Sequence, residues 1–138
     1  MSERVASCHC GALSVACSGE PRKVSLCHCQ QCQRRTGSAF SVAVFYDRAQ
    51  VAVQGEAASY VRPSASGFAV DFRFCPTCGS NLFWYPARMP ALVGVAYGGF
   101  ADPDFVIPDQ AVWSSEGHRW VNLPDHVVSF EGNPPARR

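Results

Sequence analysis

Residues 68–85 read FAVDFRFCPTCGSNLFWY, and this stretch decides the fold class. Up to Phe74, hydrophobic side chains alternate with small or charged ones, which is the period-two pattern of a strand with one buried face. A CPTCG turn follows at residues 75–79, and a second strand is predicted over residues 81–85. The stretch therefore predicts a β-hairpin whose turn carries two cysteines.

The chain on either side of this hairpin is also strand-like. Runs rich in β-branched and aromatic residues predict strands at residues 13–17, 24–26, 39–46, 51–53, 58–61 and 92–97. Only residues 31–35 look helical, and the chain after Gly98 is rich in prolines and loop-like. Many short strands with little helix indicate an all-β protein. We expect a single domain over residues 1–138, with an ordered core at about residues 4–130 and a frayed tail at 132–138.

Composition excludes several classes of protein. With 47% hydrophobic and 12% aromatic residues, the 138-residue chain can bury a core and is not disordered. A formal net charge of +1 makes nucleic acid an unlikely partner and gives no attraction to anionic membranes. No apolar run is long enough to span a bilayer, and residues 1–5 lack the shape of a secretory signal. We therefore expect a cytoplasmic protein, in which the eight cysteines need an explanation other than disulfides.

Seven of the eight cysteines fall into three groups, and Zn²⁺ is the leading explanation. The groups are Cys8 and Cys10; Cys27, Cys29 and Cys32; and Cys75 and Cys78. A structural zinc site takes four protein ligands, and the simplest allocation joins the first group to the third. The middle group would then form a second site with three ligands and an open position, which is the arrangement of catalytic zinc.

Other uses of these cysteines remain open from spacing alone. Pairing Cys8 and Cys10 with two sulfurs of the middle group would leave the 75–79 turn short of ligands. Structural disulfides would need an oxidising compartment, a redox-active CxxC lacks its βαβ context, and no ferredoxin spacing is present. Cys17 is predicted to be a small buried hydrophobe. We expect His9 and His28 to point away from any metal, with His28 available to hydrogen-bond near it.

The segments CHCGAL (8–13), CHCQQCQRRTGSAF (27–40) and FCPTCGSNLF (74–83) together resemble a known family. The sequence is similar to the glutathione-dependent formaldehyde-activating enzymes, a family that also contains centromere protein V, over about residues 4–130. The resemblance implies packed antiparallel sheets around a zinc ribbon. It also implies two Zn²⁺ cofactors, a structural one on Cys8, Cys10, Cys75 and Cys78 and a second one on Cys27, Cys29 and Cys32.

The activity that the resemblance implies is carbon–sulfur bond chemistry. Family members condense formaldehyde with glutathione to S-hydroxymethylglutathione, or run the reverse reaction as a lyase. A small thiol such as glutathione and an aldehyde are then the expected partners, and the catalytic cysteines are Cys27, Cys29 and Cys32.

The residues that follow the middle group are candidates for binding the thiol substrate. Arg34 or Arg35 could clamp a carboxylate in bidentate fashion, and Thr36 and Ser38 could donate hydrogen bonds near the second site. The large aromatic side chains, Trp120 among them, are expected in the core and in pocket walls.

Two other classes of function compete with an enzyme. The chain could be a non-enzymatic zinc-ribbon module that binds a protein or nucleic acid, although its near-neutral charge weakens the case for nucleic acid. It could also carry out redox chemistry at an exposed thiol such as Cys17 or Cys29.

Overall fold

The structure, a computed structural model, describes residues 2–64 and 66–135. In these residues the strands are β1 (Glu3–Ser7), β2 (Ser14–Ser18), β3 (Lys23–Cys27), β4 (Ser41–Asp47), β5 (Val51–Gln54), β6 (Ala58–Pro63), β7 (Ala69–Phe74), β8 (Asn81–Pro86), β9 (Leu92–Ala96), β10 (Gln110–Val112) and β11 (Val128–Ser129). The helices are α1 (Gln30–Thr36) and the 3₁₀ turns η1 (Arg48–Gln50), η2 (Tyr97–Phe100) and η3 (Ser114–Glu116). The prediction of an all-β protein with little helix is confirmed.

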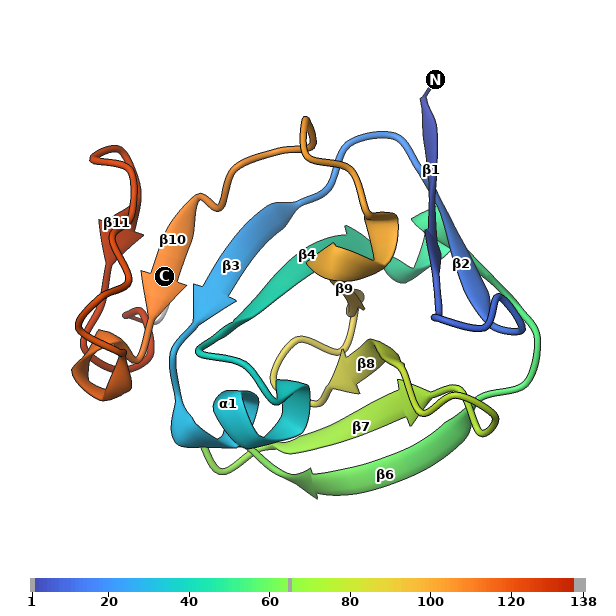
Figure 1. Ribbon diagram of the computed structural model, residues 1–138, viewed down its shortest axis with the longest axis horizontal. Helices are drawn as coiled ribbons and strands as arrows, with labels where there is room; N and C mark the ends of the chain where they lie inside the picture. The colour runs from blue at the N-terminus through green and yellow to red at the C-terminus, as the bar shows by residue number, and fades with distance from the viewer. Residues whose placement is uncertain (1, 65, 136–138) are drawn as a thin grey trace.

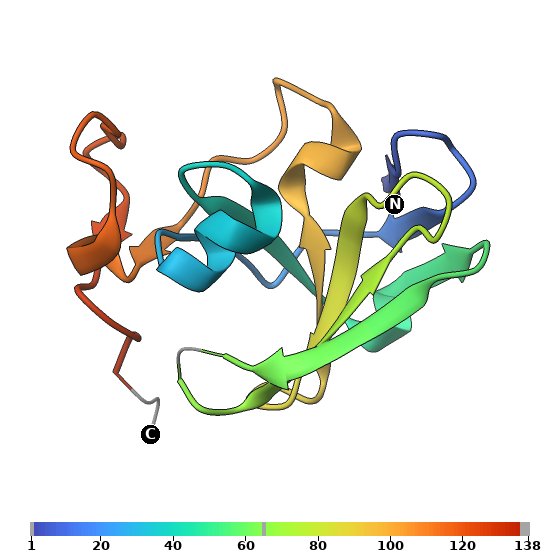
Figure 2. The same ribbon diagram turned by 60° about the horizontal axis from the view of Figure 1, so that its bottom comes forward.

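The strands form two sheets (Figure 1). A three-stranded sheet has the order β1-β2-β5, and an eight-stranded sheet has the order β11-β10-β3-β4-β9-β8-β7-β6. Most neighbouring strands are antiparallel, as expected, but β10 runs parallel to both β3 and β11. Figure 2 shows that the connection containing α1 and the turn η2 lie on the same side of the large sheet.

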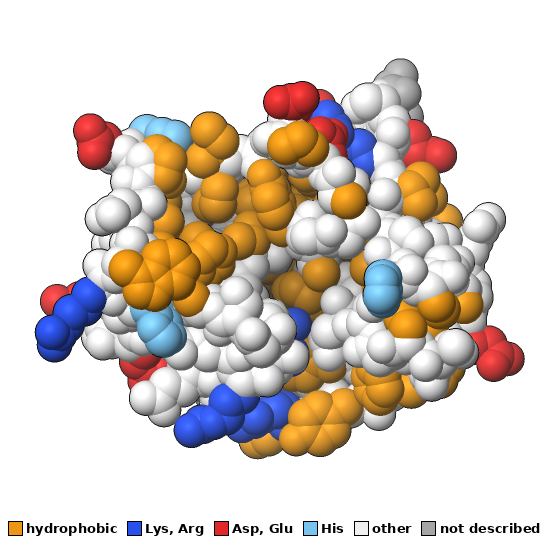
Figure 3. Space-filling model, in the orientation of Figure 1, with side chains coloured by type: hydrophobic (Ala, Val, Ile, Leu, Met, Phe, Trp, Pro, Cys, Tyr) orange, Lys and Arg blue, Asp and Glu red, His pale blue; other side chains and the backbone are white. Residues whose placement is uncertain are grey.

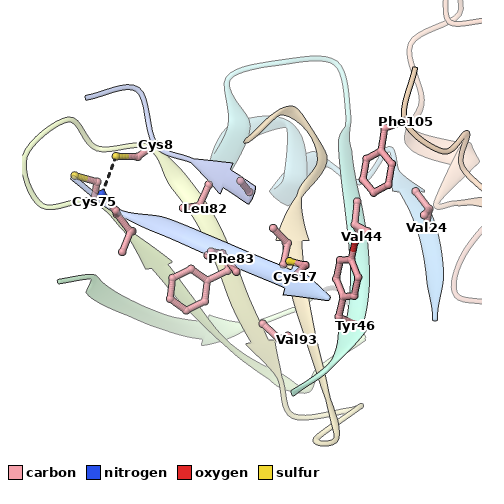
Figure 4. Close-up of a cluster of buried hydrophobic side chains, with 14 residues drawn as sticks. Cys8, Cys17, Val24, Val44, Tyr46, Cys75, Leu82, Phe83, Val93 and Phe105 are labelled. Atoms are coloured by element: carbon pink, nitrogen blue, oxygen red, sulfur yellow. Dashed lines mark hydrogen bonds between the residues drawn. The ribbon is translucent and has the colours of Figure 1, made fainter. Parts of the chain in front are cut away.

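The main core lies between the two sheets (Figure 4). Val15 and Cys17 of the small sheet pack in one cluster with Val44, Tyr46 and Val95 of the large sheet. Side chains of β4 alternate between this cluster and a second one on the opposite face of the large sheet, which contains Ala43 and Phe45. Cys17 is 1% exposed, so its prediction as a buried hydrophobe is confirmed.

A β-bulge interrupts the hairpin that the sequence predicts over residues 68–85. Arg73 pairs with Phe83, but the next residue, Phe74, pairs with Asn81, so that Leu82 is an extra residue in β8. Consecutive residues of a regular strand point to opposite faces, yet Leu82 and Phe83 both belong to the main core. Directly after the CxxC turn, the bulge thus changes which face of the sheet the following side chains of β8 point toward.

Some expectations from the sequence need correction. Trp120, expected in the core or a pocket wall, is 69% exposed, because it lies in the irregular segment beyond η3. The predicted strand at residues 39–46 begins only at Ser41. In the tail, the Trp113 backbone N–H donates to the Gly132 carbonyl at 3.1 Å, while the predicted fraying of 136–138 lies outside the described residues. Within residues 2–64 and 66–135, no helix is long and apolar enough to cross a membrane.

Candidate metal centres

Two tight turns bring the first and third cysteine groups together. In one turn, the Gly11 N–H donates to the Cys8 carbonyl at 3.2 Å. In the other, the Gly79 N–H donates to the Cys75 carbonyl at 2.8 Å. Both glycines have positive φ, 85° for Gly11 and 79° for Gly79, a conformation that side chains disfavour. Each turn therefore presents two sulfurs on one side.

The four sulfurs lie at distances that suit one metal ion. The Sγ atoms of Cys8, Cys10, Cys75 and Cys78 are all within 4.8 Å of one another. The Cys8 and Cys10 sulfurs are 3.7 Å apart, and those of Cys10 and Cys75 are 3.6 Å apart. A tetrahedral zinc site with Zn–S bonds of about 2.3 Å has sulfurs about 3.8 Å apart, so the residues fit Zn²⁺. All eight cysteines are free, and none forms a disulfide.

Hydrogen-bond donors surround this four-cysteine cluster. The Leu13 N–H donates to Cys8 Sγ at 3.2 Å, and Ser80 Oγ lies 3.2 Å from Cys78 Sγ. The Ser80 hydroxyl is the main cause that lowers the pKa of the Cys78 thiol to about 5. The His9 N–H donates in turn to Ser80 Oγ at 3.0 Å, which fixes the hydroxyl. Such donors stabilise thiolates, the form in which cysteine binds zinc.

The middle group forms a second, three-cysteine cluster where β3 leads into α1. Cys27 is the last residue of β3, Cys29 precedes α1 and Cys32 lies in its first turn. Their Sγ atoms are all within 4.8 Å of one another. The Cys32 N–H donates to Cys29 Sγ at 3.3 Å, so a cysteine of the cluster also caps the helix. Three sulfurs leave one position of a tetrahedron open.

Proton sharing within this cluster favours one thiolate. Hydrogen bonds from Cys27 and then Cys29 hold the pKa of the Cys32 thiol well below its usual range, with smaller contributions from Ser41 and the charge of Arg35. The hydrogen bond with Cys29 conversely raises the pKa of Cys27. The two clusters, of four and of three cysteines, could each hold a metal ion, and their donor sets are consistent with zinc.

A cleft of about 870 Å³ lies beside the four-cysteine cluster, and Cys27, Cys29 and Cys32 are not among the described residues that line it. Its lining includes Cys8, His9 and Ser80 of the four-cysteine turns, together with Ser41 at the start of β4, which contributes to the lowered pKa of Cys32. Figure 3 shows a hollow near the centre of this face with hydrophobic side chains on its floor. The lining also includes Arg35, Thr36, Phe40, Asn81, Trp84, Tyr97 and Gly99. The volume is within the range of small-molecule sites.

The two candidate arginines, Arg34 and Arg35, have different environments. The Arg35 guanidinium lies 4.6 Å from the ring centroid of Trp84 and 4.8 Å from that of Phe72. Its Nη1 also donates to Asn81 Oδ1 at 3.3 Å. Arg35 is thus a cation held in place at the cleft wall by cation–π contacts. Arg34, the preceding residue, is exposed and does not line the cleft.

Thr36, too, lines the cleft, whereas Ser38 does not. The Thr36 hydroxyl donates to the Cys32 carbonyl at 2.8 Å, and so it closes the last turn of α1. The Ser38 N–H donates to Thr36 Oγ1 at 3.2 Å. Ser80 and Asn81 were not predicted as site residues from the sequence, although both follow the CPTCG turn directly.

Comparison with known proteins agrees with this geometry. Residues 3–116 match the model of a family described as "Glutathione-dependent formaldehyde-activating enzyme". A crystal structure of a Rhodobacter sphaeroides protein is similar in fold, with a TM-score of 0.54 and 24% identity, covering 75% of this chain and 91% of that one. None of the curated proteins compared with the chain matches it. On the family match over most of its length, the chain belongs to the glutathione-dependent formaldehyde-activating enzyme family.

Proposed function

We propose that this protein is a zinc-dependent carbon–sulfur lyase or synthase that forms or cleaves the S-hydroxymethyl adduct of a small thiol such as glutathione. The observation that carries the proposal is the three-cysteine cluster, whose Sγ atoms lie within 4.8 Å of one another. The helix α1, which carries Cys32, also contributes Arg35 and Thr36 to the cleft. Membership of the family supports the same reaction. The proposed catalytic residues are Cys27, Cys29 and Cys32.

Charge at the cleft favours an anionic thiol. Among the described residues that line it, Arg35 is a cation and none is an aspartate or glutamate. A guanidinium binds carboxylates through two parallel hydrogen bonds, and glutathione carries two carboxylates. Stacking on Trp84 fixes Arg35 before substrate arrives, which lowers the entropy cost of binding. We assign Arg35 to a substrate carboxylate, with Thr36 at the same wall.

The reaction needs a thiolate and a donor for the oxygen. A zinc ion bound by the three cysteines would favour the thiolate form of a thiol at its open position. The substrate thiol loses its proton to water, its sulfur attacks the aldehyde carbon, and the C–S bond forms as the C=O π bond opens. The oxygen then takes a proton back from water, so that no net proton is gained or lost. Asn81 Oδ1 already accepts from Arg35, which leaves the Asn81 amide nitrogen to donate to that oxygen.

Exchange NMR spectroscopy of formaldehyde and glutathione tests the proposal, because it measures the catalysed rate above the spontaneous one. We expect catalysis by the zinc-loaded wild type, its loss by at least about 100-fold in Cys32→Ser, and its retention in Cys17→Ala. Cys17 is the matched control, since it is a cysteine outside both clusters. Unchanged exchange in Cys32→Ser would overturn the proposal. A folded wild type with two zinc ions and no catalysis would instead favour a zinc-binding module.

A further inference from the structure

The amide of Gln33 makes three side-chain hydrogen bonds beside the three-cysteine cluster. Its Nε2 donates to the His28 carbonyl at 2.7 Å and to the Glu116 carbonyl at 3.0 Å. Its Oε1 lies 2.8 Å from His118 Nε2. Carbonyl oxygens only accept, so the orientation of the amide is fixed, and His118 must donate from Nε2. Every hydrogen of the Gln33 amide is therefore used.

These bonds join segments that are far apart in the sequence. His28 lies between the ligands Cys27 and Cys29, Gln33 lies on α1, and Glu116 belongs to η3 near the end of the described chain. A further bond runs from the Gln30 N–H to Glu116 Oε1 at 2.9 Å, at the start of α1. The segment around η3 thus holds both the link between Cys27 and Cys29 and the helix that carries Cys32.

The segment after η3 also packs closely against His28. A Cβ at Gly117 would lie 2.8 Å from His28 Nδ1 and 3.2 Å from the Ser114 carbonyl oxygen. The backbone after η3 therefore passes directly over the His28 imidazole. In addition, the His28 N–H donates to the Val112 carbonyl at 3.1 Å, which continues the β3–β10 pairing to the cluster.

We propose that Gln33 is a positioning residue that sets the geometry of the three-cysteine cluster for metal binding, with the Glu116–His118 segment as its support. At seven residues, α1 is too short to be stable alone, so external bonds must fix Cys32 relative to Cys27 and Cys29. Hydrogen bonds behind metal ligands typically govern about 10- to 100-fold in affinity. The inference rests on the proposed function only in taking this cluster as a metal site.

Gln33→Glu is the sharpest test, because it keeps the size of the side chain and replaces the amide nitrogen, which donates two hydrogen bonds, by a carboxylate oxygen that faces the same two carbonyl oxygens. Gln31→Glu is the matched control: it places the same charge on the same helix at a residue with no side-chain hydrogen bond among those described. The four-cysteine cluster is an internal reference, since none of the bonds of Gln33 reaches it.

Titration of the metal-free protein with Zn²⁺ against a chromophoric chelator gives the affinity of each site. Co²⁺ substitution reports the geometry through the thiolate-to-metal absorption. We expect Gln33→Glu to weaken the second site by about 10- to 100-fold and to alter its Co²⁺ spectrum, with the first site unchanged. Gln31→Glu should match the wild type at both sites.

His118→Ala is a milder variant that removes one exposed donor, so it keeps the test open if Gln33→Glu does not fold. It should weaken the second site on its own and add little in a Gln33→Ala background. Equal second-site affinity in Gln33→Glu, Gln31→Glu and the wild type would overturn the inference, as would equal weakening of both sites. A wild type that binds one metal ion only would overturn the proposed function itself.

Discussion

The indole of Trp84 covers Gly94 on the neighbouring strand. The two residues are paired across β8 and β9, and a Cβ at position 94 would lie 2.6 Å from Cε2 of the indole. Glycine is therefore required at this position, because any side chain would displace the ring. Gly94 also affects the cleft, because the Trp84 ring that packs on it is the ring on which Arg35 stacks.

Gly94→Ala should therefore affect both stability and substrate binding. Forcing a methyl group against a buried ring costs about 1–3 kcal/mol, which denaturant unfolding would measure. We also expect KM for the carboxylate-bearing thiol to rise, because Arg35 loses its platform. The control is Gly132→Ala, where a Cβ meets no atom within 4 Å and which does not line the cleft. Full retention of both properties in Gly94→Ala would contradict this account of the ring.

Arg35 and Arg34 should differ sharply when each is replaced by alanine. For glutathione, Arg35→Ala is expected to raise KM by about 10-fold or more, since a hydrogen bond to a charged group contributes about 1.5–3 kcal/mol. Arg34→Ala should leave KM unchanged, because the side chain is exposed outside the cleft. With 2-mercaptoethanol, which has no carboxylate, the two variants should behave alike. Steady-state kinetics with both thiols decides the matter, and an equal effect of the two arginines would contradict the assignment.

Removal of metal from the four-cysteine cluster should unfold the region around it. The cluster ties the N-terminal turn at Cys8 to the β7–β8 turn at Cys75. Loss of a structural metal is among the most destabilising changes. We therefore expect Cys78→Ser to lower the free energy of unfolding by more than about 4 kcal/mol and to bind one zinc ion fewer than the wild type. Thermal unfolding and metal analysis measure the two effects. Two zinc ions bound in Cys78→Ser would show that Cys78 is no ligand.

Stability should fall in alkaline solution because of the buried Cys17. Burial, and secondly the charge of Glu3, raises the pKa of its thiol to about 12 from its ordinary value of 9.0. A raised folded-state pKa means that stability is full below about pH 9 and is lost as the pH rises toward 12. The loss should be about 1 kcal/mol by about pH 10. Burial also raises the pKa of the Tyr46 hydroxyl to about 12, which acts in the same direction.

Urea unfolding at about pH 8 and about pH 10 tests this expectation, with Cys17→Ala as the comparison. The variant should lose less stability than the wild type between the two conditions. An equal loss of stability in the wild type and in Cys17→Ala would show that Cys17 does not contribute to the pH dependence.

Local patterns in the sequence were enough to predict the hairpin and the cysteine groups. The alternation before Phe74 and the turn at residues 75–79 are properties of consecutive residues, and β7 and β8 lie where this pattern indicates. The helix predicted at residues 31–35 is found at Gln30–Thr36, between a cap at Cys29 and a left-handed Gly37. Spacing also favoured the division of the sulfurs into four and three.

Features that depend on distant residues were not predictable in this way. β10 is three residues long, too short for a periodicity, and it exists because β3 offers it a parallel edge. Which of Arg34 and Arg35 faces the cleft depends on the rings of β7 and β8 that α1 meets. Gln33 bonds to residues 83 and 85 positions further on, and no local signal marks such a partner.

The parallel pairing of β10 with β3 has a consequence for the order in which the chain is assembled during synthesis. All three sulfurs of the smaller cluster are present once Cys32 has been made, but their supports at Val112 and Glu116 follow about 80 residues later. The four-cysteine cluster, by contrast, is complete at Cys78. Contacts between distant residues form only after a costly loop closure. The cluster that is most local in the sequence is therefore the last to acquire its final geometry.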